Sequence, residues 1–157
     1  MTDNNYAALR AQALHWKCPQ VVSTTSDTRA HPCAVVMDWA LGTAVATVIA
    51  LSDGTASIYY SNGGGFIGGG QGSATIRETA IHAVSIAGRL LADMLPTSDF
   101  PLPENDSVIF YVVTERGVYM AKASVASLST NRHPLTAIGN DMQTIITAYR
   151  KIDSIKK

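Results

Sequence analysis

A glycine-rich tract is the part of this sequence that most directly suggests chemistry. Residues 62–72 read Asn-Gly-Gly-Gly-Phe-Ile-Gly-Gly-Gly-Gln-Gly and hold seven of the chain's 12 glycines. The tract lies between a predicted strand and a predicted helix, where free N–H groups and the positive end of the helix dipole can hold a phosphate or carboxylate. The residues predicted for such a ligand site are Gly63, Gly64, Gly65, Gly68, Gly69, Gly70, Gln71 and Ser73.

Two other interpretations of this tract remain open. It is not a P-loop, because no Lys-Ser or Lys-Thr pair follows the last glycine. It could be a flexible or tightly turned connection with Phe66 and Ile67 packed into the core, or a contact for a protein partner. Ordering so many glycines costs conformational entropy. This cost favours a functional role for the tract over an accidental run of glycines.

The remaining residues with reactive side chains form no catalytic or metal-binding pattern. The histidines are His15, His31, His82 and His133, and no two of them have H-x-H or H-E-x-x-H spacing. We interpret them as surface or capping histidines, with a helical contact available between His82 and Glu78. The sequence therefore predicts no metal site and no cofactor.

Candidate nucleophiles and acids are equally isolated. Ser73, Ser85 and Cys33 stand outside any G-x-S-x-G elbow. Asp38 and Asp53 lie near the ends of predicted strands, where carboxylates can act in pairs but where aspartate also serves turns. We predict no catalytic residue, and we lean towards a protein that is not an enzyme.

Two cysteines, Cys18 and Cys33, belong to no C-x-x-C motif. A domain of 157 residues can bury enough surface to fold without a disulfide. We expect both thiols to be reduced and semi-buried. The N-terminal residues show neither a basic region nor an apolar stretch typical of a signal peptide, so a cytoplasmic location is expected.

The composition is apolar and poor in charge. Hydrophobic residues make up 46% and charged residues 15%, with 12 basic and 12 acidic side chains and a net charge of zero. A neutral chain exerts no general attraction on nucleic acid or anionic lipid. The apolar run from Cys33 to Leu51 contains Asp38 and Gly42 and is better explained by two strands than by a membrane span. Weak repulsion between copies fits self-association, and we expect a homodimer.

Hydrophobic spacing and turn residues define the elements that would position these side chains. Helical spacing predicts helices over 6–16, 75–95 and from Pro134 to the C-terminal end, with a capping box of Thr75 and Glu78. Alternation and two-faced apolar runs predict strands over 33–40, 43–51, 55–61, 107–114 and 117–125. Turns are expected at Leu41-Gly42 and Asp53-Gly54, and 96–106 is expected to be a connection.

These elements predict a single α+β domain over 1–157. Residues 1–32 form an N-terminal helix and a polar loop, and 33–155 form the core unit. The order is α-βββ-α-ββ-α. Because the hairpins are short, the sheet is antiparallel, with about five strands, and the three helices cover one or both faces.

The same order resembles the roadblock/longin-like group, which includes dynein light chains of the roadblock type. The likeness is carried by the strand over 34–38 that ends in Asp38, the helix over 75–95, the hairpin of 108–113 with 117–120, and the closing helix over 140–155. Two features depart from that pattern: three strands are expected before the central helix and two after it, where the family usually has two and three, and the glycine tract is no family signature. The resemblance implies a non-catalytic dimer that regulates small GTPases or motors, and it carries over no site residue.

Two function classes follow. The first is a homodimeric, non-enzymatic interaction or scaffold domain with a protein partner. The second is a small-molecule or anion-binding domain, conceivably an enzyme, that uses the loop Gly63–Gly72 at a helix N-terminus. The aromatic residues, such as Tyr59 and Tyr60 on opposite faces of a strand, are interpreted as core with one exposed side available for an interface.

Overall fold

A computed structural model describes residues 5–19, 30–69, 72–130 and 132–156 of the chain, with the backbone alone for 67–69 and 153–156. The elements are α1 (Asn5–Leu14), β1 (Pro32–Ala40), β2 (Val45–Leu51), β3 (Ala56–Tyr60), β4 (Gly65–Gly69), α2 (Ala74–Leu90), the 3-10 turn η1 (Leu91–Asp93), β5 (Leu95–Thr97), β6 (Ser107–Thr114), β7 (Gly117–Ser124), α3 (Val125–Leu128) and α4 (Thr136–Lys156). The α+β class is confirmed.

All described strands belong to one antiparallel sheet of seven, in the order β4-β3-β2-β1-β6-β7-β5. The expected hairpins are present. The turn between β2 and β3 uses Asp53, whose carboxylate accepts from the Thr55 amide at 2.9 Å, and Gly54 at φ 95°. The prediction of about five strands was too low, because two short edge strands carried no alternating apolar pattern.

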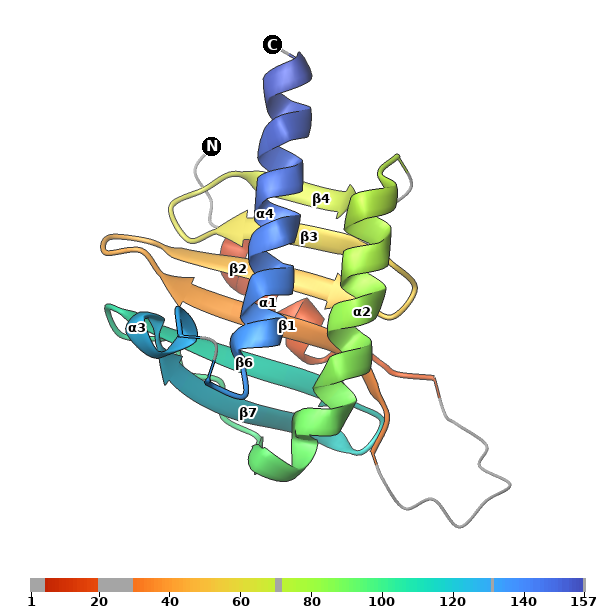
Figure 1. Cartoon of the computed structure of the whole chain (residues 1–157), viewed down its shortest axis with the longest axis vertical. Coiled ribbons are helices and arrows are strands. Elements are labelled where there is room, and N and C mark those ends of the chain that lie inside the picture. Colours follow the sequence, from red (N-terminus) through yellow and green to blue (C-terminus); the bar gives the residue numbers. More distant parts are fainter. Residues whose placement is uncertain (1–4, 20–29, 70–71, 131, 157) are drawn as a thin grey trace.

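The two faces of the sheet are covered by different helices (Figure 1). On the front face, α2 and α4 cross the strands, and α3 lies beside α4 near β7. Their apolar stripes, which include Ile138 and Ile145 of α4, pack on strand residues such as the fully buried Val35, Ile58 and Phe110. We call these residues the front core. The sequence predicted both its amphipathic helices and its strands with two apolar faces.

The back face is covered by α1, which lies behind the sheet in Figure 1. Tyr6 and Leu14 from α1 pack on Val36, Ile109 and Tyr111, and Phe100 from the loop after β5 packs against the same cluster. These residues form the back core. The ten-residue α1 thus covers the back of the central strands. Coverage on both faces is what the sequence predicted for a strand with two apolar faces.

The middle of the glycine tract is a strand, which corrects the prediction of a loop over Gly63–Gly72. Gly63 and Gly64 form the turn after β3 with φ of 106° and 86°, and Gly65–Gly69 is the edge strand β4. Gly65 has φ 150°, and a Cβ there would overlap the Ile58 carbonyl oxygen, so only glycine allows this close pairing. Gly70 and Gln71 lie outside the described residues.

Three further expectations about elements were wrong. Helix α2 begins at Ala74 and is capped by Ser73, whose Oγ accepts from the Ile76 amide at 3.2 Å, in place of a Thr75–Glu78 box. The expected connection over 96–106 begins in the strand β5, and the short helix α3 was not predicted. Four strands precede α2 and three follow it, which also differs from the order predicted from the sequence.

Within the described residues, no helix is both long enough and apolar enough to cross a membrane. The run from Cys33 to Leu51 forms the two strands that the sequence predicted.

Candidate functional site

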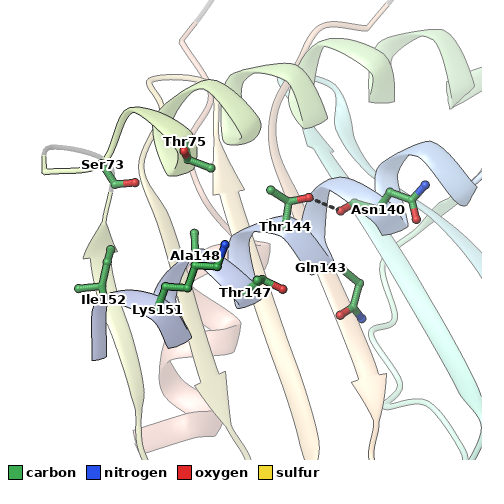
Figure 2. A pocket seen from close by; sticks show the side chains of 9 residues that line it. All are labelled: Ser73, Thr75, Asn140, Gln143, Thr144, Thr147, Ala148, Lys151 and Ile152. Atoms are coloured by element: carbon green, nitrogen blue, oxygen red, sulfur yellow. Dashed lines mark hydrogen bonds between the residues drawn. The ribbon is translucent and has the colours of Figure 1, made fainter. Parts of the chain in front are cut away.

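A polar groove of about 580 Å³ lies between the N-terminus of α2 and the outer side of α4. Figure 2 shows the residues that line it, with two on the α2 side and the rest along α4. They are Ser73, Thr75, Asn140, Gln143, Thr144, Thr147, Ala148, Lys151 and Ile152. We call this surface the α2–α4 groove.

The local sequence explains why the groove is polar. Helix α4 turns its apolar stripe of Ile138, Met142 and Ile145 towards the sheet, so the residues between them face outwards. On the groove side of α4, the polar ones are the hydroxyl or amide residues Asn140, Gln143, Thr144 and Thr147, together with Lys151. Thr144 Oγ1 donates to the Asn140 carbonyl at 2.9 Å, the contact drawn in Figure 2. The bond uses the backbone oxygen of Asn140, and the exposed Asn140 side chain lines the groove.

The groove has positive electrostatic character. Lys151 is the one ionisable side chain among its lining residues. Helix α2 has no acidic side chain in its first turn to offset the positive end of its dipole. Its first helical bond is Arg77 N–H to the Ser73 carbonyl at 3.1 Å, so the Ala74 and Thr75 amides precede the intrahelical ladder. An anionic oxygen suits this combination of donors.

Only one of the residues predicted from the glycine tract lines this groove. That residue is Ser73, the cap of α2. Gly63, Gly64, Gly65, Gly68 and Gly69 belong to the β3–β4 hairpin, and Gly70 and Gln71 are not described. The α4 residues of the groove were missed, although the polar positions between the apolar residues of that helix already marked an exposed face.

The histidine prediction missed a contact between helices. His82 of α2 meets Asp141 of α4, with Nδ1 and Oδ2 2.6 Å apart, rather than pairing with Glu78. Burial raises the pKa of the Asp141 carboxyl. A His–Asp pair can orient a nucleophile in an acyl-transfer enzyme, but in the described residues no serine, threonine or cysteine is hydrogen-bonded to His82. The pair ties α2 to α4.

His133 and His15 make contacts within their own segments, whereas His31 meets the distant Glu115. His133 Nδ1 accepts from the Leu135 amide at 3.0 Å at the start of α4. His15 Nδ1 lies 2.9 Å from the Ala11 carbonyl oxygen, and the His31 amide donates to Glu115 at 2.8 Å.

Asp38 lies near the end of a strand, as predicted, but it serves neither a turn nor a pair of carboxylates. It lies within β1 and is fully buried under α1. Arg10 Nη2 donates to Asp38 Oδ2 at 2.7 Å, and Thr47 Oγ1 donates to Oδ1 at 2.5 Å. The Tyr6 hydroxyl lies 2.6 Å from Thr47 Oγ1, which extends the chain of hydrogen bonds into α1.

The surroundings of this pair are fully occupied by protein groups. Arg10 also donates to the Phe100 carbonyl at 3.0 Å, and the Tyr111 hydroxyl donates to the Pro101 carbonyl at 2.6 Å. Burial raises the pKa of Tyr111 to about 12 and also raises that of Tyr6. Because these bonds join α1, β1, β2 and the loop after β5, we assign this back-face cluster to fixing α1 and that loop onto the sheet.

The two cysteines form a disulfide, which corrects the prediction of reduced thiols. Cys18 follows α1 and Cys33 lies in β1, with Cα atoms 5.6 Å apart, a separation that suits a disulfide. Sequence spacing could not reveal this proximity, because packing α1 on the back face is what brings the two residues together.

A second, more apolar cavity of about 220 Å³ lies between the sheet and the α3–α4 connection. It is lined by Met37, Trp39, Val108, Val125, Leu128, Ser129, Thr136, Gly139, Asn140 and Gln143. Asn140 and Gln143 also line the α2–α4 groove, so the two hollows meet at these amides.

Across the residues that the structure describes, no three His, Cys, Asp or Glu side chains gather in a way that could hold a metal ion. No known protein family, curated protein or solved structure matches this chain. The geometry of the groove and of the sheet therefore carries the functional argument.

Proposed function

We propose that this chain is a non-enzymatic interaction domain that holds an anionic oxygen group of its ligand or partner in the α2–α4 groove. The observation that carries the proposal is a groove of about 580 Å³ whose polar lining consists of hydroxyls, amides and the Lys151 ammonium group. This set can donate several hydrogen bonds and one positive charge to a carboxylate or phosphate.

The same lining favours binding over catalysis. General acid–base chemistry uses a side chain whose pKa lies near the working pH, most often a histidine or a carboxyl. The residues around the groove include neither, and the His82–Asp141 pair is already engaged between helices at 2.6 Å. Ligand specificity would come from the pattern of donors, as in other sites that orient a ligand with a few polar groups.

The test is an NMR titration of the isotope-labelled chain with inorganic phosphate and, separately, with acetate. We expect the amide signals of Ser73, Thr75 and Thr147 to shift together and saturably. The variant Lys151→Met keeps the length of the side chain and removes its charge, so it should weaken phosphate binding about tenfold, the effect of losing one charge-assisted contact.

The matched control is Lys122→Met. Lys122 is an exposed lysine of β7, away from the groove. It should leave the titration unchanged. Shifts spread evenly over the surface, or equal loss in the Lys122 and Lys151 variants, would contradict a groove site.

The kind of partner is a second part of the proposal. The resemblance of the sequence to the roadblock/longin-like group makes a small GTPase or a motor subunit the partner that we propose, and a homodimer the working form. Pull-down of candidate GTPases by the wild-type chain, with Lys151→Met as the comparison, tests this part. If the wild-type chain and Lys151→Met retain a GTPase equally well, that partner does not bind through the groove.

The cytoplasmic location remains a prediction as well. The Cys18–Cys33 disulfide is of a kind that persists mainly in oxidising compartments. Thiol-trapping of the protein in its native cells, followed by mass spectrometry, measures the oxidised fraction. A fully reduced pair would support the cytoplasm, and a fully oxidised pair would count against it.

A further inference from the structure

The two edges of the sheet are built differently. The edge strand β5 has three residues and carries Pro96 at its centre, which removes a backbone donor and protects the edge from pairing. The opposite edge strand, β4, has five residues, Gly65–Gly69, with no proline and no charge. An unprotected edge of this kind is a template for another strand.

Charge is missing from the segment of chain that forms β4 and its flanks. From Gly54 to Ile76 the sequence contains no Asp, Glu, Lys or Arg, and this stretch covers β3, β4 and the start of α2. Natural edges are usually blocked by lysine or another charged side chain. Two β4 strands can therefore pair without repulsion between charged side chains of the strands themselves.

Helix α4 extends past this edge (Figure 1). Its Tyr149 ring stacks on Phe66 of β4, with ring centroids 4.9 Å apart, and the Tyr149 hydroxyl donates to the Ala56 carbonyl of β3. The helix continues for seven residues after Tyr149, to Lys156. At 1.5 Å per residue this overhang is about 10 Å long, which equals about two strand spacings.

We propose that β4 pairs with β4 of a second copy of this chain, so that two sheets join into one and each α4 overhang lies on the partner's sheet. Antiparallel pairing of the same strand about a two-fold axis is self-complementary, as a symmetric dimer requires. The overhang has the length to cover two more strands, and a second copy supplies them as its own β4 and β3.

The surface that the partner's helix would cover is suitably apolar. Phe66 and Tyr60 on the front face remain only partly buried in the single chain. Burying aromatic side chains at a subunit contact is favourable. The α2–α4 groove ends at Lys151 and Ile152 on the same overhang, so the dimer would place the groove next to the subunit boundary.

The experiment is sedimentation equilibrium of the full chain from submicromolar concentration upwards, joined to hydrogen exchange measured at low and high concentration. We expect a monomer–dimer equilibrium. Exchange in peptides that cover 65–69 should slow as the dimer forms, while exchange in peptides that cover 95–97 should not change with concentration.

Two lysine substitutions make the test specific to one edge. Gly68→Lys places like charges against each other across the β4 pair and should raise the dimer dissociation constant at least about tenfold. Thr97→Lys, the matched change on the β5 edge, should leave it unchanged. Circular dichroism establishes that both variants are folded. Should Gly68→Lys not fold, removal of residues 153–157 from the overhang replaces it and should weaken the dimer by a similar factor.

A monomer at every concentration would overturn the proposal, as would a dimer that Gly68→Lys and the shortened helix leave intact. A monomer whose β4 becomes protected only when a foreign peptide is added would also overturn it, because the edge would then serve another partner. The anion-binding proposal is tested by the Lys151 titration and stands or falls separately.

Discussion

The helices that cover the front and back faces of the sheet are held in place by different kinds of interaction. The front core joins α2 and α4 to the sheet almost wholly through apolar side chains, such as Ile138, Met142 and Ile145. The back core is smaller, and α1 is fixed there by the Arg10–Asp38 ion pair with its hydrogen bonds. A disulfide adds a covalent tie on that side.

This difference follows from the size of the covering helices. Two long amphipathic helices bury enough apolar surface to hold themselves in place, whereas a ten-residue helix does not. A buried ion pair contributes little net stability while both partners are present, but removing one partner leaves an unpaired charge in the interior. We therefore expect the back face to be held by a few specific groups and the front face by many small contributions.

The largest expected effect is from Asp38→Ala. It leaves Arg10 of α1 without its acidic partner, so the free energy of unfolding should fall by about 3–5 kcal/mol, measured by urea denaturation. Asp38→Asn keeps an acceptor for Thr47 and should cost less. A cost below that of a typical surface change would show that α1 does not depend on the pair.

On the front face, Ile145→Ala should lower the free energy of unfolding by about 3 kcal/mol, because it opens a cavity at a fully buried site. Ile145→Val is the matched control and should cost about 1 kcal/mol. If Ile145→Ala cost clearly more than Asp38→Ala, the division between distributed and specific stabilisation would fail.

Opening the disulfide should have an intermediate effect. Cys18 and Cys33 are separated by 15 positions, and closing a loop of that length stabilises the fold by about 2–3 kcal/mol. Thermal unfolding of Cys18→Ser with Cys33→Ser, compared with the oxidised wild type, measures it. Hydrogen exchange should rise in α1 and stay unchanged in α4. Equal loosening of both helices would remove the distinction between the faces.

The smallest change is Tyr111→Phe, which deletes the hydroxyl that donates to Pro101. It should cost about 1 kcal/mol at neutral pH. The pKa of Tyr111 is raised from 10 to about 12 in the fold, so the unfolded state ionises first and stability falls as pH rises from about 10 to 12. In alkaline denaturation, the free energy of unfolding of Tyr111→Phe should decrease less steeply with pH than that of the wild type. An equally steep decrease would show that Tyr111 is not the group responsible.

Local signals in the sequence were sufficient for much of the fold. Apolar spacing predicted α1, α2 and α4, and two-faced apolar runs predicted β1, β2, β6 and β7, because helix and strand periods are properties of neighbouring residues. Asp53-Gly54 predicted its hairpin from turn chemistry alone. The edge strands β4 and β5 were missed, because three to five residues rich in glycine or proline carry no period.

The candidate site was predicted only at Ser73. Its position before α2 is visible in the sequence, whereas Lys151 and Thr147 join it only because α4 crosses the sheet beside α2. The same holds for the His82–Asp141 contact, which bridges positions 59 residues apart.

The sequence by itself determined the class of the fold, its hairpins and the low charge of its surface, since these depend on composition and short-range pattern. Tertiary structure alone decided that Asp38 is buried under Arg10, that Cys18 meets Cys33, and that the glycine tract forms an open edge beneath an overhanging helix. Each of these depends on how far-separated elements pack, and packing is set by the whole chain rather than by any segment of it.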